Sequence, residues 1–561
     1  MITHIQKITL FILVLCCSLS VAAASEAEYQ KLSKTWTLNA DGSQEFRYVM
    51  ALTLHTHAAM NGKYGETFIQ YNPTYQDLKI NRSYTKQKNG NIVETPANAF
   101  VEVLPKNAAD APAYNHLKEM VVVHTGLELG ATIYLDYTIT SQPGYQPEID
   151  VFEPIQPSSP VRDYRLSIVT PLDKTVYFTF GNLFQKALVA ENNGQRTTSW
   201  NLRNVPQVST SPSVSVSNGD MLYLAATTYG DKKTALQTLY KQMDQPSEAI
   251  QALAADLVKD AKCTNEKIKS IYHFVSHHLA SSPLSHSETG NHIRSAQEVL
   301  ETAYGTELEK ANLLSALLNA AGMKAEVFAG YPVKAATGMA LTAINHFYVA
   351  VDSQKYVLSP SSLARPQTVV FSQTPVYRVK NGLLVEFPAS SNYQIVSEQK
   401  VSMKAGKWSV ETDETVGTDL LPYFTEEKQT KTESMSMNTQ HGYATLVLKE
   451  SSYGISTLGY GHLNSSRKVN LMLPRLVDET YTYQVNCPSN MQLCTPITNK
   501  EIHNPAGNLV ISVKKSGQHI TVTRSLKLYK QLYTPAEYAA LRSLLTTWSN
   551  VNNRTLLFAV K

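Results

Sequence analysis

Cysteine, charge imbalance and long apolar runs are all scarce in this chain of 561 residues. It holds only 5 cysteines, and two of them, Cys16 and Cys17, lie near its start, which excludes a disulfide-rich scaffold and a cysteine-rich zinc protein. Its 50 lysines and arginines nearly balance 46 aspartates and glutamates, so a formal charge of +4 gives no electrostatic case for nucleic acid. Glycine and proline, at 25 each, are too few for a collagen-like or disordered chain.

The first apolar run has the form of a secretory signal. Residues 1–24 contain Lys7, then an apolar stretch of about 12 residues, then the small residues Ala22-Ala23-Ala24. A membrane-spanning helix needs ~20 apolar residues. No later stretch is apolar enough, so we expect no transmembrane segment in the mature chain. We expect an exported protein, periplasmic by default, with the cell surface or the outside medium as alternatives.

Three cysteines remain after this signal. Cys487 and Cys494 bracket a short loop that contains Pro488. Because exported chains oxidise, we predict a disulfide between these two cysteines. Cys263 is left over just before a predicted helix. It is either a thiol activated by the helix N-terminus or a small buried residue, and we favour the buried residue.

Three regions with different hydrophobic patterns follow. Residues 25–231 are rich in β-branched and aromatic runs separated by turn signals, which predicts an N-terminal β-sandwich domain. Residues 232–375 begin with helical patterns and then return to strands. Residues 380–561 are again β-patterned and end in a helix predicted over 535–548, with Thr534 as its N-cap. The sequence thus predicts an α+β multidomain protein.

Two helices of the middle region carry clear start signals. Ser295 and Glu298 form a capping box for one helix, and Thr306 and Glu309 form a capping box for the next. Behind the second box, apolar residues recur on one helical face until Gly322, which ends the helix.

Strands should follow this helix. The pattern predicts them at 325–333, 347–351 and 355–358, and a two-residue turn at 352–353 would join the last two.

The middle region resembles the core of the transglutaminase-like superfamily. The resemblance is carried by the stretches AQEVL at 296–300, LLSALLNAAGM at 313–323, NHFYVAV at 345–351 and YVLSP at 356–360. The order of the regions is also similar to that of exported proteins of Gram-negative bacteria in which a β-sandwich domain of unknown function precedes a transglutaminase-like core. The resemblance implies a papain-like α+β core between an N-terminal and a C-terminal β-sandwich.

Active members of that superfamily use a Cys-His-Asp triad whose cysteine begins the core helix. The matching stretch, GTELEKANLL, has Glu307 at the cysteine position. The histidine is kept as His346, and Ser359 stands at the aspartate position. With a two-residue turn, His346 should face Ser359. Asp352 would then lie six residues away along the strand, roughly 20 Å, which is too far to replace the aspartate.

The resemblance therefore implies a pseudoenzyme, and the sequence indicates no cofactor or metal. Glu307 is either a first-turn acid that stabilises the helix or an acid that binds a ligand or transfers protons, and His346 is either part of the scaffold or functional. We expect the groove beside Glu307, His346 and Ser359 to bind a peptide, a protein or an envelope polymer, or the protein to act as a scaffold.

Two alternatives stay open. One is an active hydrolase or acyltransferase that uses Glu307 and His346 without a cysteine. The other is a surface adhesion or glycan-binding protein that acts through its β-sandwich domains.

Overall fold

The structure is a computed structural model that describes residues 25–209, 211, 220–243, 246–333, 337–352, 354–365, 374–387 and 392–561. The predicted signal at 1–24 lies outside these residues. The predicted α+β fold with several sheets is confirmed. Within the described ranges no helix is both long and apolar enough to cross a membrane.

The chain forms two compact units by its internal contacts. The first consists of Met1–Ile149, Pro154–Val176 and Gln185–Val208. The second consists of Asp150–Glu153, Tyr177–Phe184 and Ser209–Lys561, so it contains both the helical core and the C-terminal sheets. The division into three domains at 231 and 380 stays a prediction.

The first unit is built on an eight-stranded sheet. Its order is β12 (Leu188–Asn192), β13 (Gln195–Val205), β10 (Val161–Pro171), β1 (Ala27–Leu38), β2 (Gln44–Leu54), β8 (Thr132–Ser141), β4 (Gln76–Lys86) and β5 (Ile92–Glu94). A three-stranded sheet accompanies it, in the order β3 (Glu66–Tyr71), β7 (Lys118–Val123) and β6 (Phe100–Val103). Burial alternates along β8 at every residue, as expected for a strand with one face toward a core.

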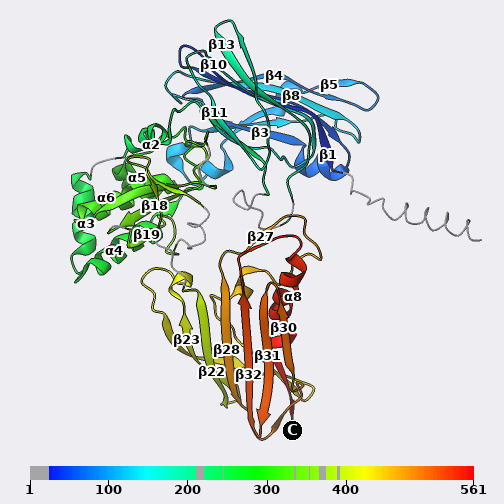
Figure 1. Cartoon of the computed structure of the whole chain (residues 1–561), viewed down its shortest axis with the longest axis vertical. Helices are drawn as coiled ribbons and strands as arrows, with labels where there is room; N and C mark the ends of the chain where they lie inside the picture. Colours follow the sequence, from blue (N-terminus) through cyan, green and yellow to red (C-terminus); the bar gives the residue numbers. More distant parts are fainter. Residues whose placement is uncertain are drawn as a thin grey trace, which may run out of the picture. The chain divides into compact units, whose positions relative to one another are not determined.

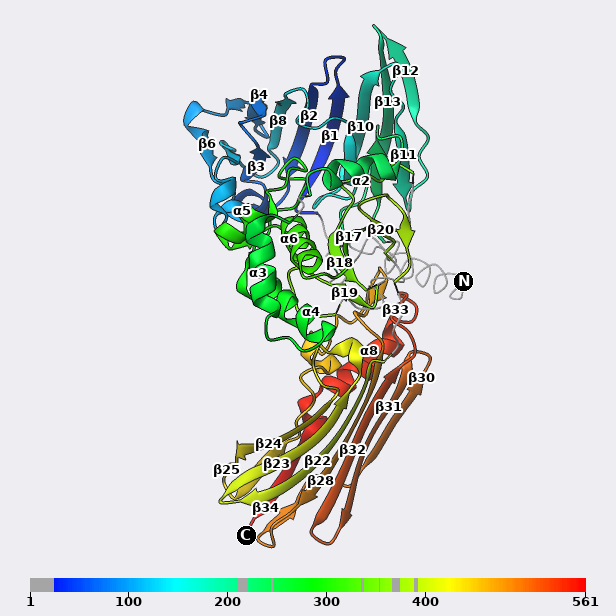
Figure 2. The same cartoon turned by 90° about the vertical axis from the view of Figure 1, so that its left-hand side faces the viewer.

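The helical core packs against a five-stranded sheet. The sheet order is β19 (Tyr356–Leu358), β18 (His346–Val351), β17 (Ala325–Gly330), β20 (Val376–Arg378) and β21 (Leu384–Val385). The helices are α2 (Lys232–Tyr240), α3 (Glu248–Val258), α4 (Thr264–His273), α5 (Ala296–Thr302) and α6 (Glu307–Ala320). Helix α6 lies between α3 and β18 (Figure 2), and its leucines are buried there. Both predicted capping boxes are confirmed, at the starts of α5 and α6.

The hairpin between β18 and β19 differs from the prediction. Val351 pairs with Tyr356, so the connection spans the four residues 352–355 and not two. Asp352 and Gln354 both adopt a positive φ, of 51° and 74°, although neither is glycine; residue 353 lies outside the described residues. Glycine usually marks a positive φ in a sequence. Because this turn uses other residues, its length could not be predicted from the sequence.

A small three-stranded sheet also belongs to the second unit. Its order is β11 (Tyr177–Gly181), β14 (Tyr223–Thr227) and β9 (Asp150–Pro154). Tyr223, Ala225 and Tyr229 are buried in the same apolar cluster as the leucines of α6. Segments that precede residue 232 therefore belong to the core itself.

The C-terminal part combines two sheets and a helix. A seven-stranded sheet has the order β24 (Lys428–Ser436), β23 (Lys407–Val416), β22 (Gln394–Lys404), β28 (Val477–Asn486), β32 (His519–Leu528), β31 (Gly507–Ser516) and β30 (Asn499–Asn504). A four-stranded sheet has the order β25 (Asn438–Gln440), β26 (Tyr443–Val447), β34 (Thr555–Val560) and β29 (Met491–Leu493). Helix α8 (Tyr538–Ser549) runs along the seven-stranded sheet (Figure 1).

Helix α8 begins later than predicted. Its N-cap is Glu537 and not Thr534. The carboxylate of Glu537 accepts hydrogen bonds from the amide and the hydroxyl of Thr534, both at 3.0 Å. The predicted first turn is therefore a separate turn that leads into the helix.

The predicted disulfide between Cys487 and Cys494 is not formed. Both residues are free thiols. Cys487 follows β28 of the seven-stranded sheet and is buried, with its Sγ 3.4 Å from the carbonyl oxygen of Met491. Cys494 follows β29 of the four-stranded sheet and is exposed. Because the loop joins two different sheets, the two side chains lie in different surroundings.

Candidate functional site

Glu307 is the first residue of α6, at the position that the sequence analysis assigned to a nucleophile. Thr306 is the N-cap, and its hydroxyl accepts a hydrogen bond from the amide of Glu309. The side chain of Glu307 is 34% exposed. A carboxylate at this position is favourable because a helix N-terminus carries a partial positive charge of about +0.5.

The turn behind Glu307 is fixed by a buried ion pair. The fully buried Glu309 accepts from Arg294, with Nε to Oε1 and Nη2 to Oε2 both at 3.0 Å. The same carboxylate accepts from the amide of Thr306 at 2.8 Å. Arg294 also donates to the carbonyl of Tyr304. The start of α6 is therefore held rigidly, whatever residue stands at 307.

A second buried charged residue directly follows Glu309 on α6. Lys310 is fully buried, and its ammonium donates to the carbonyl of Leu279 and the hydroxyl of Ser281, both at 2.9 Å. Ser281 belongs to β15 (Ala280–Ser281), which pairs with β16 (Tyr304–Gly305) just before α6. Burial lowers the pKa of Lys310 from 10.5 to about 8.

His346 is close to Glu307, as predicted, but not in contact through a hydrogen bond. It begins β18 opposite Gly330 of β17. Its Nδ1 lies 3.6 Å from Oε1 of Glu307, and its side chain is 53% exposed. This distance allows a weak ion pair when the imidazole is charged, and it exceeds the hydrogen-bond reach of about 2.6–3.2 Å.

Ser359 does not face His346. With Val349 paired to Leu358, continuing the register places Ser359 opposite Tyr348 and not opposite His346, because the hairpin loop is longer than predicted. Within the part of the chain that the structure describes, no hydrogen bond joins Ser359 to His346. Asp352 lies at the far end of β18, as expected. Neither residue therefore orients the imidazole.

A cavity of about 230 Å³ adjoins Glu307. Its lining residues are Ser282, Pro283, Leu284, Ser285, His286, Glu307, Leu308, Ile344, Asn345 and Phe347. Of the three positions singled out by sequence, only Glu307 is among them.

The sequence analysis did not single out His286. Its Nε2 lies 2.8 Å from the carbonyl oxygen of Leu341, and a carbonyl only accepts, so Nε2 carries the proton. Burial lowers the pKa of His286 below 6.5, although the nearby charge of Glu307 opposes this shift. His286 is therefore a neutral side chain at neutral pH. No motif could have found it, because its partner is 55 residues away along the chain.

Glu307 also influences Tyr348, which neighbours His346 on β18. Burial, and secondarily the negative charge of Glu307, raise the pKa of the Tyr348 phenol well above its usual range. The ring of Tyr348 lies 6.1 Å from that of His346. The Glu307 charge thus acts on the buried phenol of Tyr348 and the buried imidazole of His286.

Cys263 does not take part in this site. It is the exposed N-cap residue of α4, and its thiol makes no capping hydrogen bond. It does not line the cavity beside Glu307. The expectation that Cys263 is buried is wrong, because an N-cap residue precedes the apolar face of its helix.

Family models match three successive parts of the chain. A domain of unknown function, DUF3857, matches residues 40–209, the transglutaminase-like superfamily matches residues 251–358, and a second domain of unknown function, DUF3858, matches residues 446–558. A comparison with curated proteins finds no match.

One solved structure is similar over nearly the whole chain. It is described as a "putative protease" from Parabacteroides distasonis, is 40% identical, and aligns over 96% of this chain and 100% of its own with a TM-score of 0.83. A "putative cysteine protease" from Cytophaga hutchinsonii is 12% identical over 51% of this chain and 96% of its own, with a TM-score of 0.20. An M1 zinc metallopeptidase from Deinococcus radiodurans is 13% identical over 36% of this chain and 42% of its own, with a TM-score of 0.21. The last two similarities are too low to support an inference.

Proposed function

Since the chain belongs to the transglutaminase-like superfamily, with its core between a DUF3857 and a DUF3858 domain, we propose that it is a non-catalytic member that binds an amine-bearing segment of a peptide or cell-envelope polymer. One observation carries this proposal. The carboxylate of Glu307 stands at the start of α6, where the superfamily's active members place a thiolate, and it lines a cavity of about 230 Å³.

The chemistry of Glu307 supports a binding role over catalysis. A carboxylate is a far weaker nucleophile than a thiolate, and its attack on an amide would form a reactive anhydride. Acid–base catalysis with His346 would need closer approach than the observed 3.6 Å. An imidazole that no aspartate orients is also a poor proton carrier.

The cavity has the charge to hold an amine. Among its described lining residues Glu307 is the one charged group, since His286 is neutral and no lysine or arginine is present. Ser282, Ser285 and Asn345 supply further polar groups at its wall. A volume of about 230 Å³ is below the roughly 300–1,000 Å³ of whole-ligand sites, so it fits one side chain or a chain end.

We also propose that the protein acts outside the cytoplasm. The support is the signal-like sequence of residues 1–24, which precedes the described residues. The alternative role in adhesion or glycan binding would require the isolated β-sheet domains to bind sugars, and a glycan array tests that separately.

A first experiment tests whether the protein is catalytic. Purified protein is assayed for incorporation of a fluorescent amine into casein and for hydrolysis of peptide amides, beside its His346→Ala variant. We expect both proteins to match the buffer blank, because Glu307, a weak nucleophile, stands at the start of α6 in place of a cysteine. Activity that is present in the parent and disappears in His346→Ala would overturn the non-catalytic proposal.

A second experiment tests amine binding at Glu307. Binding of a fluorescent lysine-containing peptide is compared with that of the same peptide acetylated on lysine, and a soluble polyamine separates peptide from polymer recognition. We expect Glu307→Gln to weaken binding of the unmodified peptide about tenfold, as loss of a charge-assisted bond would. Glu301→Gln, which removes an exposed acid from α5, is the control. Equal affinity for the two peptides would contradict the proposal.

A further inference from the structure

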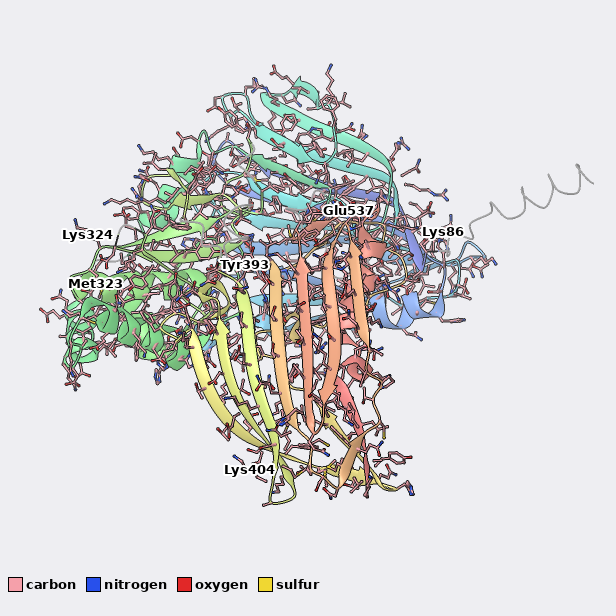
Figure 3. All side chains as sticks on the ribbon, turned by 60° about the horizontal axis from the view of Figure 1, so that its bottom comes forward. Lys86, Met323, Lys324, Tyr393, Lys404 and Glu537 are labelled. Carbon is pink, nitrogen blue, oxygen red and sulfur yellow. The ribbon has the colours of Figure 1, made fainter. Side chains whose placement is uncertain are left out.

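A larger cavity lies elsewhere on the core and shares no lining residue with the Glu307 cavity. Its volume is about 890 Å³, which is within the range of small-molecule sites. It is lined by one face of α6, the end of α2 with the residues that follow it, the start of β17, the end of β18 with Gln354 after it, and the end of β20. Lys324, just before β17, is exposed and lies at the outer edge of the core (Figure 3).

The wall of this cavity is strongly basic. Its described charged residues are the cations Lys241, Lys324, Arg378 and Lys380 and the acid Glu326, which is four positive charges against one negative, a formal +3. Glu326 is paired with Arg378, with Oε2 3.2 Å from Nε. Within the described residues none of the three lysines forms an ion pair. Residues 244 and 245, which separate Met243 from Pro246 in the sequence, lie outside the described residues.

A buried amide on α6 adds a polar group without a partner. Asn312, Ser315 and Asn319 follow one face of the helix. The last two bond to the backbone of Ala325 in β17, with Asn319 both donating to its carbonyl and accepting from its amide at 3.0 Å. Asn312 is 3% exposed, and its Nδ2 has no hydrogen-bond partner.

A buried amide without a partner costs free energy that a hydrogen-bonding ligand can recover. Because Asn312 lines the cavity, a ligand placed there would supply the missing acceptor.

The rest of the wall is largely apolar, with Gln354 as a further polar residue. Met243, Pro246, Ala316, Val327 and Phe328 contribute to it. A ligand that fits must therefore combine an anionic head, which the lysines attract, with an apolar body.

We propose that this cavity binds a small amphipathic organic anion, with a carboxylate or phosphate head. The site is distinct from Glu307 and does not depend on the amine-binding function, so the two proposals can fail separately. Carboxylate and phosphate share the charge and acceptor oxygens that the wall recognises, and the experiment distinguishes them.

The test is calorimetric titration of the whole chain from residue 25 with octanoate, octyl phosphate and inorganic phosphate. We expect one octyl compound to bind with a Kd of about 1 mM or tighter, and inorganic phosphate to bind at least about tenfold more weakly because it lacks the apolar body. The tighter of the two octyl compounds identifies the head group. Affinity should fall as NaCl is raised, because the lysines are solvent-accessible.

Three variants locate the site. Lys324→Glu together with Lys380→Glu should raise the Kd at least about tenfold, since each change reverses a charge near the head group. Asn312→Leu keeps the side-chain size and should also weaken binding. Lys86→Glu and Lys404→Glu, two exposed lysines labelled in Figure 3, are controls that should leave the Kd unchanged.

Two results would overturn the proposal. One is the absence of binding by either octyl compound at about 10 mM, a concentration that detects even weak sites. The other is equal affinity of the parent and the double lysine variant, since that variant changes only exposed residues and its folding is checked by thermal unfolding.

Discussion

Glu307 and Lys310 lie one turn apart on α6 and have opposite electrostatic surroundings. Glu307 is partly exposed beside the positive end of the helix, which stabilises its charge. Lys310 is fully buried near the same end, where both burial and the helix dipole disfavour its charge. The two hydrogen bonds to Leu279 and Ser281 compensate only in part, since its pKa still falls to about 8.

This burial predicts a pH-dependent stability. Between about pH 8 and 10.5 the unfolded chain keeps a proton on Lys310 that the folded chain has lost, so the contribution of Lys310 to the free energy of unfolding should rise with pH. Lys310 should contribute a rise of about 2 kcal/mol between pH 8 and pH 10 in the parent, and Lys310→Met should lack this contribution. Urea unfolding at pH 8, 9 and 10 measures the difference. Lys324→Met, at an exposed lysine, should keep the parent's change of unfolding free energy with pH. The prediction is wrong if Lys310→Met also keeps it.

Helices α5 and α6 each begin with a capping box, but only α5 ends at a residue with a strained backbone. Ala303, the C-cap of α5, has a φ of 59°, a left-handed conformation that disfavours side chains. Ala321, the C-cap of α6, has a φ of −81°. Ala303 connects α5 to β16. Its left-handed conformation therefore sets the direction in which the chain enters α6.

Relieving this strain should stabilise the protein. Ala303→Gly is expected to raise the free energy of unfolding by about 1 kcal/mol, because glycine adopts a positive φ without a steric cost. The matched change Ala321→Gly should lower it by about 0.5–1 kcal/mol, since it adds only backbone freedom. Thermal unfolding of the two variants should therefore move in opposite directions. A shift of the same sign in both would contradict the assignment of strain to Ala303.

Elements set by local signals could be predicted from the sequence, and those set by distant contacts could not. Ser295 and Thr306 predict the starts of α5 and α6 because each N-cap side chain forms hydrogen bonds within its own turn. The hairpin of β18 and β19 was mispredicted because its positive φ angles fall on Asp352 and Gln354.

The candidate site follows the same rule. Glu307 and His346 were found because each lies at a fixed place in a local motif. His286 was missed because burial and a bond to Leu341 define its position. The cysteine pair was misjudged because closeness in sequence does not show that a loop joins two sheets.

At the scale of the whole molecule, the core depends on strands that precede it in the sequence. Gly338, with a φ of +93°, lies against the small sheet, where an added Cβ would be 2.6 Å from the carbonyl oxygen of Ala225 and 2.7 Å from the Cα of Phe178. Asp150 of β9 accepts a hydrogen bond from the amide of Thr342 at 2.8 Å. These contacts join parts of the second unit that are more than 100 residues apart.

The close approach at Gly338 predicts a large effect of a small change. Gly338→Ala should lower the free energy of unfolding by about 3 kcal/mol, because its Cβ would overlap backbone atoms and its φ would be strained. Gly230→Ala is a suitable control, since its Cβ would meet no atom within 4 Å. Urea unfolding of the whole chain measures both. Equal stability of the two variants would mean that the small sheet does not pack on the core in this way.

Because the two units alternate along the chain, they also limit which segments a gene recombination can exchange. The chain passes between them at residues 149, 153, 176, 184 and 208. A gene fusion or exon-like exchange that cut at residue 232 would move a core without β9, β11 and β14, and so without the backbone that faces Gly338. A recombinant that kept those strands would have to carry Pro154–Val176 and Gln185–Val208 of the first unit as well. We therefore expect that this core cannot be transferred alone. A recombinant that folds should carry the N-terminal region of the same chain together with the core.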